Sequence, residues 1–215
     1  FAARIALERI PGENSPAALR AALEGAAGAT RTGLIGSLGA RRDARAVPAI
    51  DMALPDPAAV AALGSIANKP ALDALIAVET GISGSAGTAW ADAVLRCAIG
   101  AGSEPVLAKL CGDKYPRQAR KAAFAGRVAA SGGAGGDLVF GALSGGDTVL
   151  QEAAVLAIQN TSEKSLADKA GAELDKLSPL LQAQLLPLLA GRECTSALPA
   201  AARIAKSSDV YLRQA

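Results

Sequence analysis

The side chains that could do chemistry in this 215-residue sequence are mostly basic or acidic, and histidine is missing from it altogether. Without histidine there is no Ser–His–Asp or Cys–His nucleophile, no histidine-bound zinc and no haem held by an axial histidine. Most carboxylates stand at predicted helix starts or beside lysine and arginine, which gives them structural roles rather than a place in an acid/base pair. We therefore predict no catalytic residue, no metal site and no cofactor, and a protein that is not an enzyme.

Cysteines and glycines offer two further candidates for reactive sites. Cys97, Cys111 and Cys194 have no metal-ligand spacing, and we interpret them as small core residues. A Cys97–Cys111 disulfide is the alternative, if the two residues face each other across a helical hairpin. The glycine string "SGGAGGD" (131–137) suggests a phosphate-binding loop, but it follows a predicted helix and lacks the Gly-Lys-Ser/Thr ending. We predict a flexible loop between helices there.

Basic residues form the strongest candidate for a binding surface. They gather in two short stretches, one in a predicted turn and one around the start of a predicted helix: Arg41, Arg42, Arg45, Lys114, Arg117, Arg120, Lys121 and Arg127. Spacing of i, i+3 and i+4 places Arg117, Arg120 and Lys121 on one helical face. These residues predict a site for an acidic protein partner. The alternative is a solvated helix face whose arginines cap neighbouring carbonyl groups.

The balance of charge argues against a general polyanion-binding role. The formal net charge is +2 with both signs mixed along the chain, and aromatic residues make up only 3% of it. Nucleic-acid binding through residues 113–127 is therefore the least favoured function, because few side chains can stack on bases. Trp90 and Tyr115 stand near predicted helix starts, and we interpret them as packing anchors rather than binding hot spots.

The elements that must position these residues are helices. Hydrophobic residues make up 51% of the chain, with few aromatic side chains among them, which favours an all-α fold. No stretch approaches about 18 uninterrupted apolar residues, so we predict no membrane span. In "DTVLQEAAVLAIQN" (147–160) apolar residues recur at helical spacing. The predicted apolar face of this helix consists of Val149, Leu150, Ala153, Leu156 and Ala157, and Val155 and Ile158 widen it.

Pairs of helices repeat along the chain, as two series of apolar residues show. The first series is Ile10, Leu38, Ile66, Ile99, Val128, Ile158 and Leu189, and the second is Leu19, Val47, Leu75, Leu107, Leu138, Leu166 and Leu198. The first three members of each series are 28 residues apart. One helix pair is too thin to bury its apolar faces alone, so neighbouring pairs must stack. The sequence predicts an all-α, right-handed α-solenoid of about seven two-helix repeats of about 30 residues.

Caps and breakers mark the expected ends of the helices. The predicted N-caps are Asp56, Asp113, Ser144 to Asp147, Ser178 and Ser208-Asp209, and the predicted helix ends are Gly12, Gly39, Gly100 and Gly191. The segment "ETGISGSAGT" (79–88) interrupts the rhythm with about five extra residues. Pro187 lies inside a predicted helix, where we expect it to cause a kink.

The turn "LGARRDARAVPAI" (38–50) resembles the signature of bacterial HEAT repeats, particularly the short type found in phycobilin-lyase-like proteins. The segments 113–117 and 209–213 resemble the family's aspartate and arginine at a helix start. The resemblance implies a HEAT/armadillo-like superhelix over residues 1–215, whose second helices line a concave groove. It also implies that Arg117, Arg120 and Lys121 project into that groove.

The same resemblance implies the function. We expect a non-catalytic scaffold that binds another protein, or a neighbouring domain of the same chain, through its groove. The alternative is a HEAT module of an enzyme or enzyme subunit, either lyase-like or appended to a catalytic domain. Because the sequence starts and stops within helical patterns, we also expect a single solenoid that is a segment of a longer polypeptide. No feature of the sequence assigns a compartment.

Overall fold

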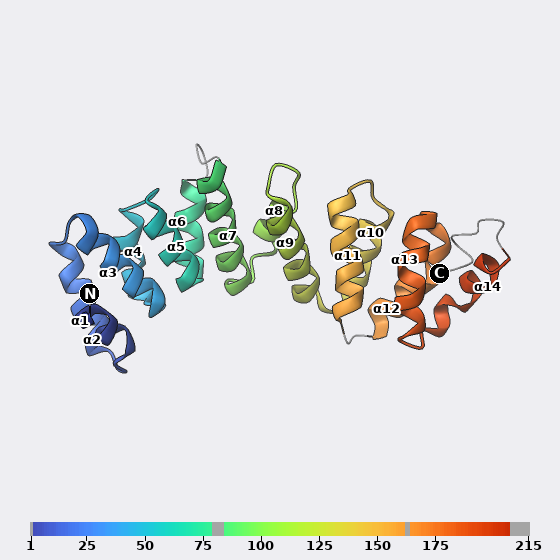
Figure 1. Ribbon diagram of the computed structural model, residues 1–215, viewed down its shortest axis with the longest axis horizontal. Helices are drawn as coiled ribbons and strands as arrows, with labels where there is room; N and C mark the ends of the chain where they lie inside the picture. The colour runs from blue at the N-terminus through green and yellow to red at the C-terminus, as the bar shows by residue number, and fades with distance from the viewer. Residues whose placement is uncertain (1, 79–83, 162–163, 207–215) are drawn as a thin grey trace. The chain divides into compact units, whose positions relative to one another are not determined.

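The structure is a computed structural model that describes residues 2–78, 84–161 and 164–206. Within these ranges it contains fourteen α-helices, four short 3-10 helices and no strand (Figure 1). The helices follow one another as seven successive pairs joined mostly by short turns, so the predicted all-α solenoid class is confirmed. The chain divides into two compact units, residues 1–119 and 120–215, and each unit is described by itself. A single solenoid over 1–215 stays a prediction.

In the first unit, the first helices of successive pairs pack side by side. These are α3 (Gly28–Ala40), α5 (Pro57–Ile66) and α7 (Gly84–Gly100), with α1 (Ala2–Arg9) and α2 (Asn14–Glu24) packed against α3. The second helices are α4 (Val47–Asp51), which follows the 3-10 helix η1 (Ala44–Ala46), α6 (Lys69–Ala77) and α8 (Glu104–Leu110). Each second helix contacts the first helix of its own pair or of the next, which completes a two-layer core.

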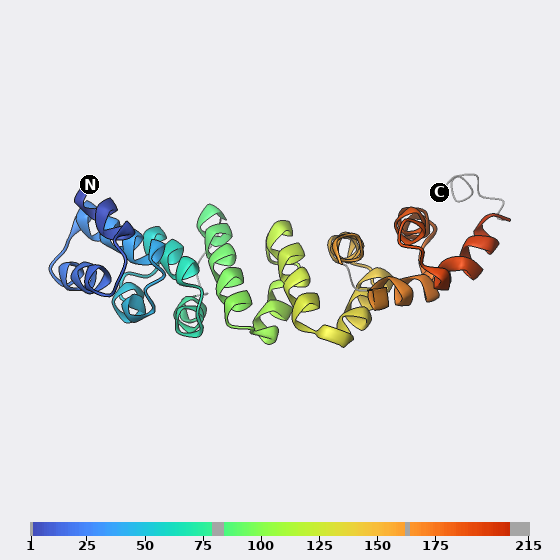
Figure 2. The ribbon, with the colours of Figure 1, turned by 90° about the horizontal axis from the view of Figure 1, so that it is seen from below.

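The second unit is also built from helix pairs, and its second helices pack on one another as well as on first helices (Figure 2). Its first helices include α11 (Thr148–Asn160) and α13 (Pro179–Ala190), which pack on each other. Its second helices are α10 (Gly135–Ser144), α12 (Lys164–Ala172) and α14 (Leu198–Ile204), interspersed with the 3-10 helices η2 (Gly132–Ala134), η3 (Leu174–Lys176) and η4 (Thr195–Ala197). The division between the units falls inside α9 (Arg117–Ala130).

Glycines let the first helices of the first unit approach closely. A Cβ atom on Gly39 would lie 2.7 Å from the Cα of Ala62, and one on Gly64 would lie 2.8 Å from the Cα of Ala93. Both distances are too short for any side chain, so glycine is required at these crossings. The prediction that Gly39 ends a helix is therefore wrong: it lies inside α3, and its small size serves packing rather than termination.

One turn recurs in both units. A single residue takes the left-handed conformation, Arg42 (φ 52°) in the first unit and Glu193 (φ 53°) in the second. The backbone N–H of the next residue donates to the carbonyl oxygen five residues earlier, at 3.0 Å in both turns. A 3-10 turn follows, and then a helix with Pro48 or Pro199 in its first turn. The local chain path is the same although the residues differ.

Several predicted helix boundaries are confirmed. The side chains of Asp56, Asp147 and Ser178 each accept a hydrogen bond from a backbone N–H in the first turn of the helix that follows. Gly100 and Gly191 lie at the ends of α7 and α13. The predicted cap at 208–209 and the first residues of the 79–88 insertion lie outside the described residues.

Two other boundary predictions are wrong. No helix begins at Asp113, because α9 starts only at Arg117, directly after Pro116. The glycine string is not a loop either: residues 132–134 form η2 and Gly135 opens α10. A Cβ atom on Gly135 would lie 3.3 Å from the carbonyl oxygen of Val128, so the glycine lets this start pack against α9. Pro187 lies within α13, which continues to Ala190.

Most of the two apolar series is buried, with exceptions at helix ends. Ile10, Ile99 and Leu198 are 49%, 51% and 63% exposed, so these members of the series mark helix ends without contributing to the core. Ile10 lies beyond the end of α1, and Leu198 is the first residue of α14, where the chain has just left the turn. Leu156 was predicted on the apolar face of α11 and is instead 40% exposed, whereas Ile158, also predicted there, is buried together with Ala153 and Ala154.

Candidate binding surfaces

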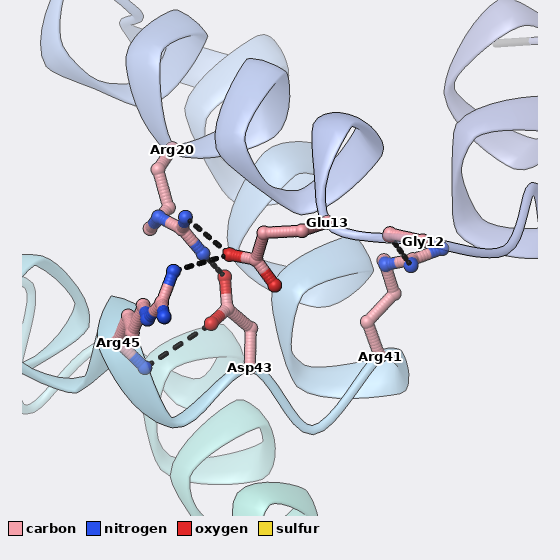
Figure 3. Close-up of polar contacts among 6 residues, drawn as sticks. All are labelled: Gly12, Glu13, Arg20, Arg41, Asp43 and Arg45. Atoms are coloured by element: carbon pink, nitrogen blue, oxygen red, sulfur yellow. Dashed lines mark hydrogen bonds and ion pairs between the residues drawn. The ribbon is translucent and has the colours of Figure 1, made fainter.

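Arg41, one of the predicted binding residues, holds the end of α1. Its guanidinium donates hydrogen bonds of 2.9 to 3.1 Å to the carbonyl oxygens of Leu7, Glu8, Ile10 and Gly12 (Figure 3). Leu7 and Glu8 are in the last turn of α1, where a helix leaves carbonyl groups without partners, and Ile10 and Gly12 follow the helix. The side chain of Arg41 therefore ties one repeat to the next.

Arg45 belongs to an ion-pair network in the same turn. Its guanidinium lies 2.7 Å from Glu13 Oε1, and Arg20 lies 2.9 Å from the same oxygen and also pairs with Asp43 (Figure 3). The hydrogen bond from Arg20 lowers the pKa of Glu13, with a smaller contribution from the charge of Arg45. This network joins the start of α2 to the turn before α4.

Arg42 differs from both of these arginines. Its side chain is exposed and makes no hydrogen bond or ion pair within the described part of the chain. It borders a hollow of about 460 Å³ between the C-terminal ends of α3, α5 and α7. We call this the arginine hollow; its lining includes Gly39, Arg42, Gly64, Arg96, Ile99 and Gly100.

The second basic stretch crosses the division between the units. Lys114 and Arg117 belong to the first unit, where the Lys114 ammonium lies 4.9 Å from the ring centre of Tyr115 and Arg117 is exposed at the start of α9. In the second unit Arg120 is only 7% exposed and pairs with Asp147. These residues therefore do not form one free basic face.

The remaining two basic residues of that stretch also lie in the second unit. Lys121 lies 3.1 Å from Glu152, and Arg127 is half-buried in the last turn of α9. Because α9 is the first helix of its pair, the expectation that its basic residues line a groove of second helices does not follow from the order of the elements.

A second hollow, which sequence reasoning missed, lies in the second unit between α9, α11 and α13. Its volume is about 400 Å³, and we call it the leucine groove; it is lined by Val155, Leu156, Gln184, Pro187 and Leu188, with Lys121 and Glu152. Leu156 and Pro187 were noticed in the sequence, but only as a core residue and a helix breaker. Hydropathy alone does not separate an exposed apolar groove from a buried face.

The predicted core residues behave as structural parts. Cys97, Cys111 and Cys194 are buried and none of them forms a disulfide, so the alternative of a Cys97–Cys111 disulfide is not realised. Burial raises the pKa of the Cys97 thiol to about 11, which makes it a poor nucleophile at neutral pH. Trp90 and Tyr115 are both buried, and the indole N–H of Trp90 donates to a backbone carbonyl oxygen at 2.9 Å.

The described residues can also be considered for a metal site and for a membrane-spanning helix. No group of three or more histidine, cysteine, aspartate or glutamate residues there is placed to hold a metal ion. None of the helices in those residues has the length and apolar character needed to cross a membrane.

Comparison with known proteins gives one structural likeness. No protein-family profile matches the sequence, and no curated protein matches it. Among solved structures, the chain is similar to the complex of CpcE and CpcF of phycocyanin lyase from Nostoc sp. PCC7120. The identity is 20% and the TM-score 0.42, over 86% of this chain and 79% of that chain. This likeness concerns the fold and assigns no activity to the chain.

That likeness corrects one prediction. The expectation that the protein is not an enzyme is wrong as an exclusion, because the similar structure is a lyase complex. The absence of histidine rules out particular mechanisms and not a part in an enzyme. The seven successive helix pairs and the recurring turn with its left-handed residue make the described residues an all-helical fold of HEAT-like repeats.

Proposed function

We propose that this chain is a HEAT-like module that binds a protein partner through the leucine groove of its second unit. The observation that carries the proposal is the groove itself. Leu156 on α11 and Pro187 on α13 are both exposed, and Val155 and Leu188 beside them are only partly covered. Contiguous apolar surface of this kind indicates a protein interaction site, whereas single exposed leucines do not.

Polar groups around the groove can orient the bound segment. The ion pair between Lys121 and Glu152 contributes one charge of each sign to the lining, and Gln184 adds an exposed amide. An apolar centre with a polar surround is the usual arrangement at protein interfaces. Covering a leucine side chain fully is worth about 1.5–3 kcal/mol, so closing the exposed part of Leu156 and Leu188 supplies useful affinity.

The eight basic residues predicted to contact the partner enter this proposal unequally. Lys121 lines the leucine groove, and Arg42 lines the arginine hollow of the first unit. Arg41 and Arg45 already hold the turn together, and Arg120 is buried in its ion pair. The proposal therefore rests on the apolar groove, with basic residues as a secondary contribution.

The second candidate is a module of an enzyme or enzyme subunit, and the same groove serves it. In that case the bound protein is a catalytic subunit or catalytic domain. The structural likeness to a lyase complex is in keeping with this version without deciding it. The identity of the protein bound at the groove separates the two candidates.

Site-specific photo-cross-linking tests the proposal in cells that produce the protein. A photo-reactive residue at Leu156 is compared with the same residue at Gln159, which is exposed on α11 but does not line the groove. We expect a discrete protein adduct from position 156 and none from position 159. Equal labelling at both positions, or no protein adduct at 156, contradicts the proposal. A catalytic protein in the adduct identifies the enzyme-module version.

A further inference from the structure

The arginine hollow of the first unit is a binding site of a different kind from the leucine groove. Its lining consists mostly of small residues, because glycines stand where the ends of neighbouring helices cross. A Cβ atom on Gly100 would lie 2.2 Å from the carbonyl oxygen of Ala67, and Gly39 and Gly64 show similar crowding against α5 and α7. These glycines let the helix ends cross closely, and the small residues Ala40, Ser65 and Ala67 leave the hollow open beside its two arginines.

Positive charge alone borders this hollow. Arg42 and Arg96 are the charged residues among those that line it, and no acidic residue does. Arg42 has no side-chain partner within the described part of the chain. Its two arginine neighbours in the turn make contacts that stabilise the fold, Arg41 with carbonyl oxygens and Arg45 with Glu13. Arg42 is thus the one arginine of this turn whose side chain makes no hydrogen bond or ion pair within the described residues.

Arg96 can also serve a ligand. It lies 3.0 Å from Asp92 one turn earlier on α7, and the two side chains are 48% and 58% exposed. An exposed pair of this kind is worth no more than about 1 kcal/mol, so a bound carboxylate can replace Asp92 at little cost. Ile99, which is 51% exposed, adds an apolar contact beside the two arginines.

We infer that the arginine hollow binds an extended acidic segment of a protein, with carboxylates at Arg42 and Arg96 and an apolar side chain against Ile99. Arginine binds carboxylates through two parallel hydrogen bonds, which gives direction as well as charge. A nucleic acid fits less well, because no aromatic residue lines the hollow and the chain's net charge is only +2. The volume of about 460 Å³ lies in the range of ordinary ligand sites.

Fluorescence anisotropy with the full chain tests this inference. The probe is a labelled peptide of repeated Glu-Leu-Glu-Gly units, and its counterpart carries glutamine in place of glutamate. Arg42→Gly removes the charge and suits the left-handed backbone at φ 52°, so it leaves the fold intact. Arg96→Gln removes the second charge. We expect each substitution to weaken binding about threefold to tenfold, and the glutamine peptide to bind weakly to every form.

Two control variants isolate the hollow. Arg9→Gln removes one exposed positive charge elsewhere in the first unit, and Glu193→Gly makes the same backbone change in the equivalent turn of the second unit. We expect both to bind the acidic peptide as the unmodified chain does. Absence of peptide binding, or equal losses from Arg9→Gln and Arg42→Gly, overturns the inference. An oligonucleotide that binds as tightly and depends on the same two arginines overturns it as well. The leucine groove lies in the other unit, so failure here leaves the proposed function standing.

Discussion

The arginine hollow and the leucine groove occupy comparable places in the repeats and differ in chemistry. Both lie between first helices of successive pairs, α3, α5 and α7 in one unit and α9, α11 and α13 in the other. Glycine and arginine line the first, whereas branched apolar residues and proline line the second. The same stacking pattern therefore presents two unlike surfaces, and the few residues at the helix crossings decide which one results.

The recurring turn teaches the same lesson on a smaller scale. Arg41 in the first unit and Arg192 in the second both donate to carbonyl oxygens of the preceding repeat. The residue two positions further on is Asp43 in one turn, paired with Arg20, and Cys194 in the other, whose thiol lies 3.4 Å from the carbonyl oxygen of Ala167. The arginine and the backbone path are kept, and the capping chemistry varies.

The largest loss of stability is expected from adding a side chain where α3 crosses α5, beside the arginine hollow. Gly39→Ala would place a Cβ atom 2.7 Å from the Cα of Ala62, and the backbone must shift. We expect a loss of about 2–3 kcal/mol in the free energy of unfolding, measured by urea denaturation. Gly36→Ala in the same helix meets only the end of the Arg4 side chain, at 4.0 Å. It should stabilise the chain by about 0.5–1 kcal/mol, because alanine favours helix.

Opposite signs for these two glycines would support the view that the first helices pack through backbone contact. Equal effects would mean that α3 and α5 do not approach each other as closely as the structure indicates. The glycines at the helix crossings would then not explain why the two hollows differ.

A smaller effect is expected from the arginines of the recurring turn. Arg41→Met keeps the apolar stem and removes four hydrogen bonds to carbonyl oxygens at the end of α1. We expect a loss of about 2 kcal/mol in the stability of the first unit. Arg192→Met removes one hydrogen bond to Gln159 and should cost about 1 kcal/mol or less. Hydrogen exchange of α1 and of α11, followed separately, distinguishes the two losses.

If Arg192→Met destabilises its unit as much as Arg41→Met does, the two arginines contribute equally to stability. The contrast drawn between their chemistry would then be wrong.

The smallest expected effect is the pH dependence of the stability that Glu13 contributes. Because the folded chain lowers the pKa of Glu13, this carboxylate stabilises the fold at neutral pH, and the stabilisation fades as the pH falls below about 4.5 and through the lowered pKa. Glu13→Gln should accelerate amide exchange in α2 at pH 7 and make little difference in acid. The equivalent turn at 189–201 has Cys194 and Ser196 in place of Asp43 and Arg45, so it lacks this ion-pair network. Amide exchange in α12 should therefore be unchanged by Glu13→Gln at either pH. A pH-independent effect of Glu13→Gln would show that the ion pairs do not hold the turn.

The repeat architecture could be predicted because stacking imposes a regular spacing of apolar residues. Leu38, Val47 and Leu75 follow that spacing and are buried as predicted. The errors fall where neighbours decide the outcome. Gly39 resembles a helix end in the sequence, but the close approach of Ala62 explains it. Leu156 fits a buried face by periodicity, whereas packing on α11 favours Ala154 and Ile158.

The candidate site was predictable only in part, for a related reason. A run of basic residues indicates charge without showing which members are already paired. Within "ARRDAR" the structure engages Arg41 and Arg45 and leaves Arg42 exposed, a distinction that depends on residues about 30 positions away. The sequence does not indicate the leucine groove, because its residues come from three helices and each of its apolar residues is also typical of a core.

The central claim is that a protein partner binds at the leucine groove. It is tested most directly by the affinity of the partner recovered by cross-linking for Leu156→Glu and for Gln159→Glu. Both variants place the same charge on α11, at residues that are exposed in the structure, and only position 156 lines the groove. We predict at least a tenfold loss of affinity, about 1.4 kcal/mol, for Leu156→Glu and almost none for Gln159→Glu. Equal affinity of the two variants for the partner would contradict the claim.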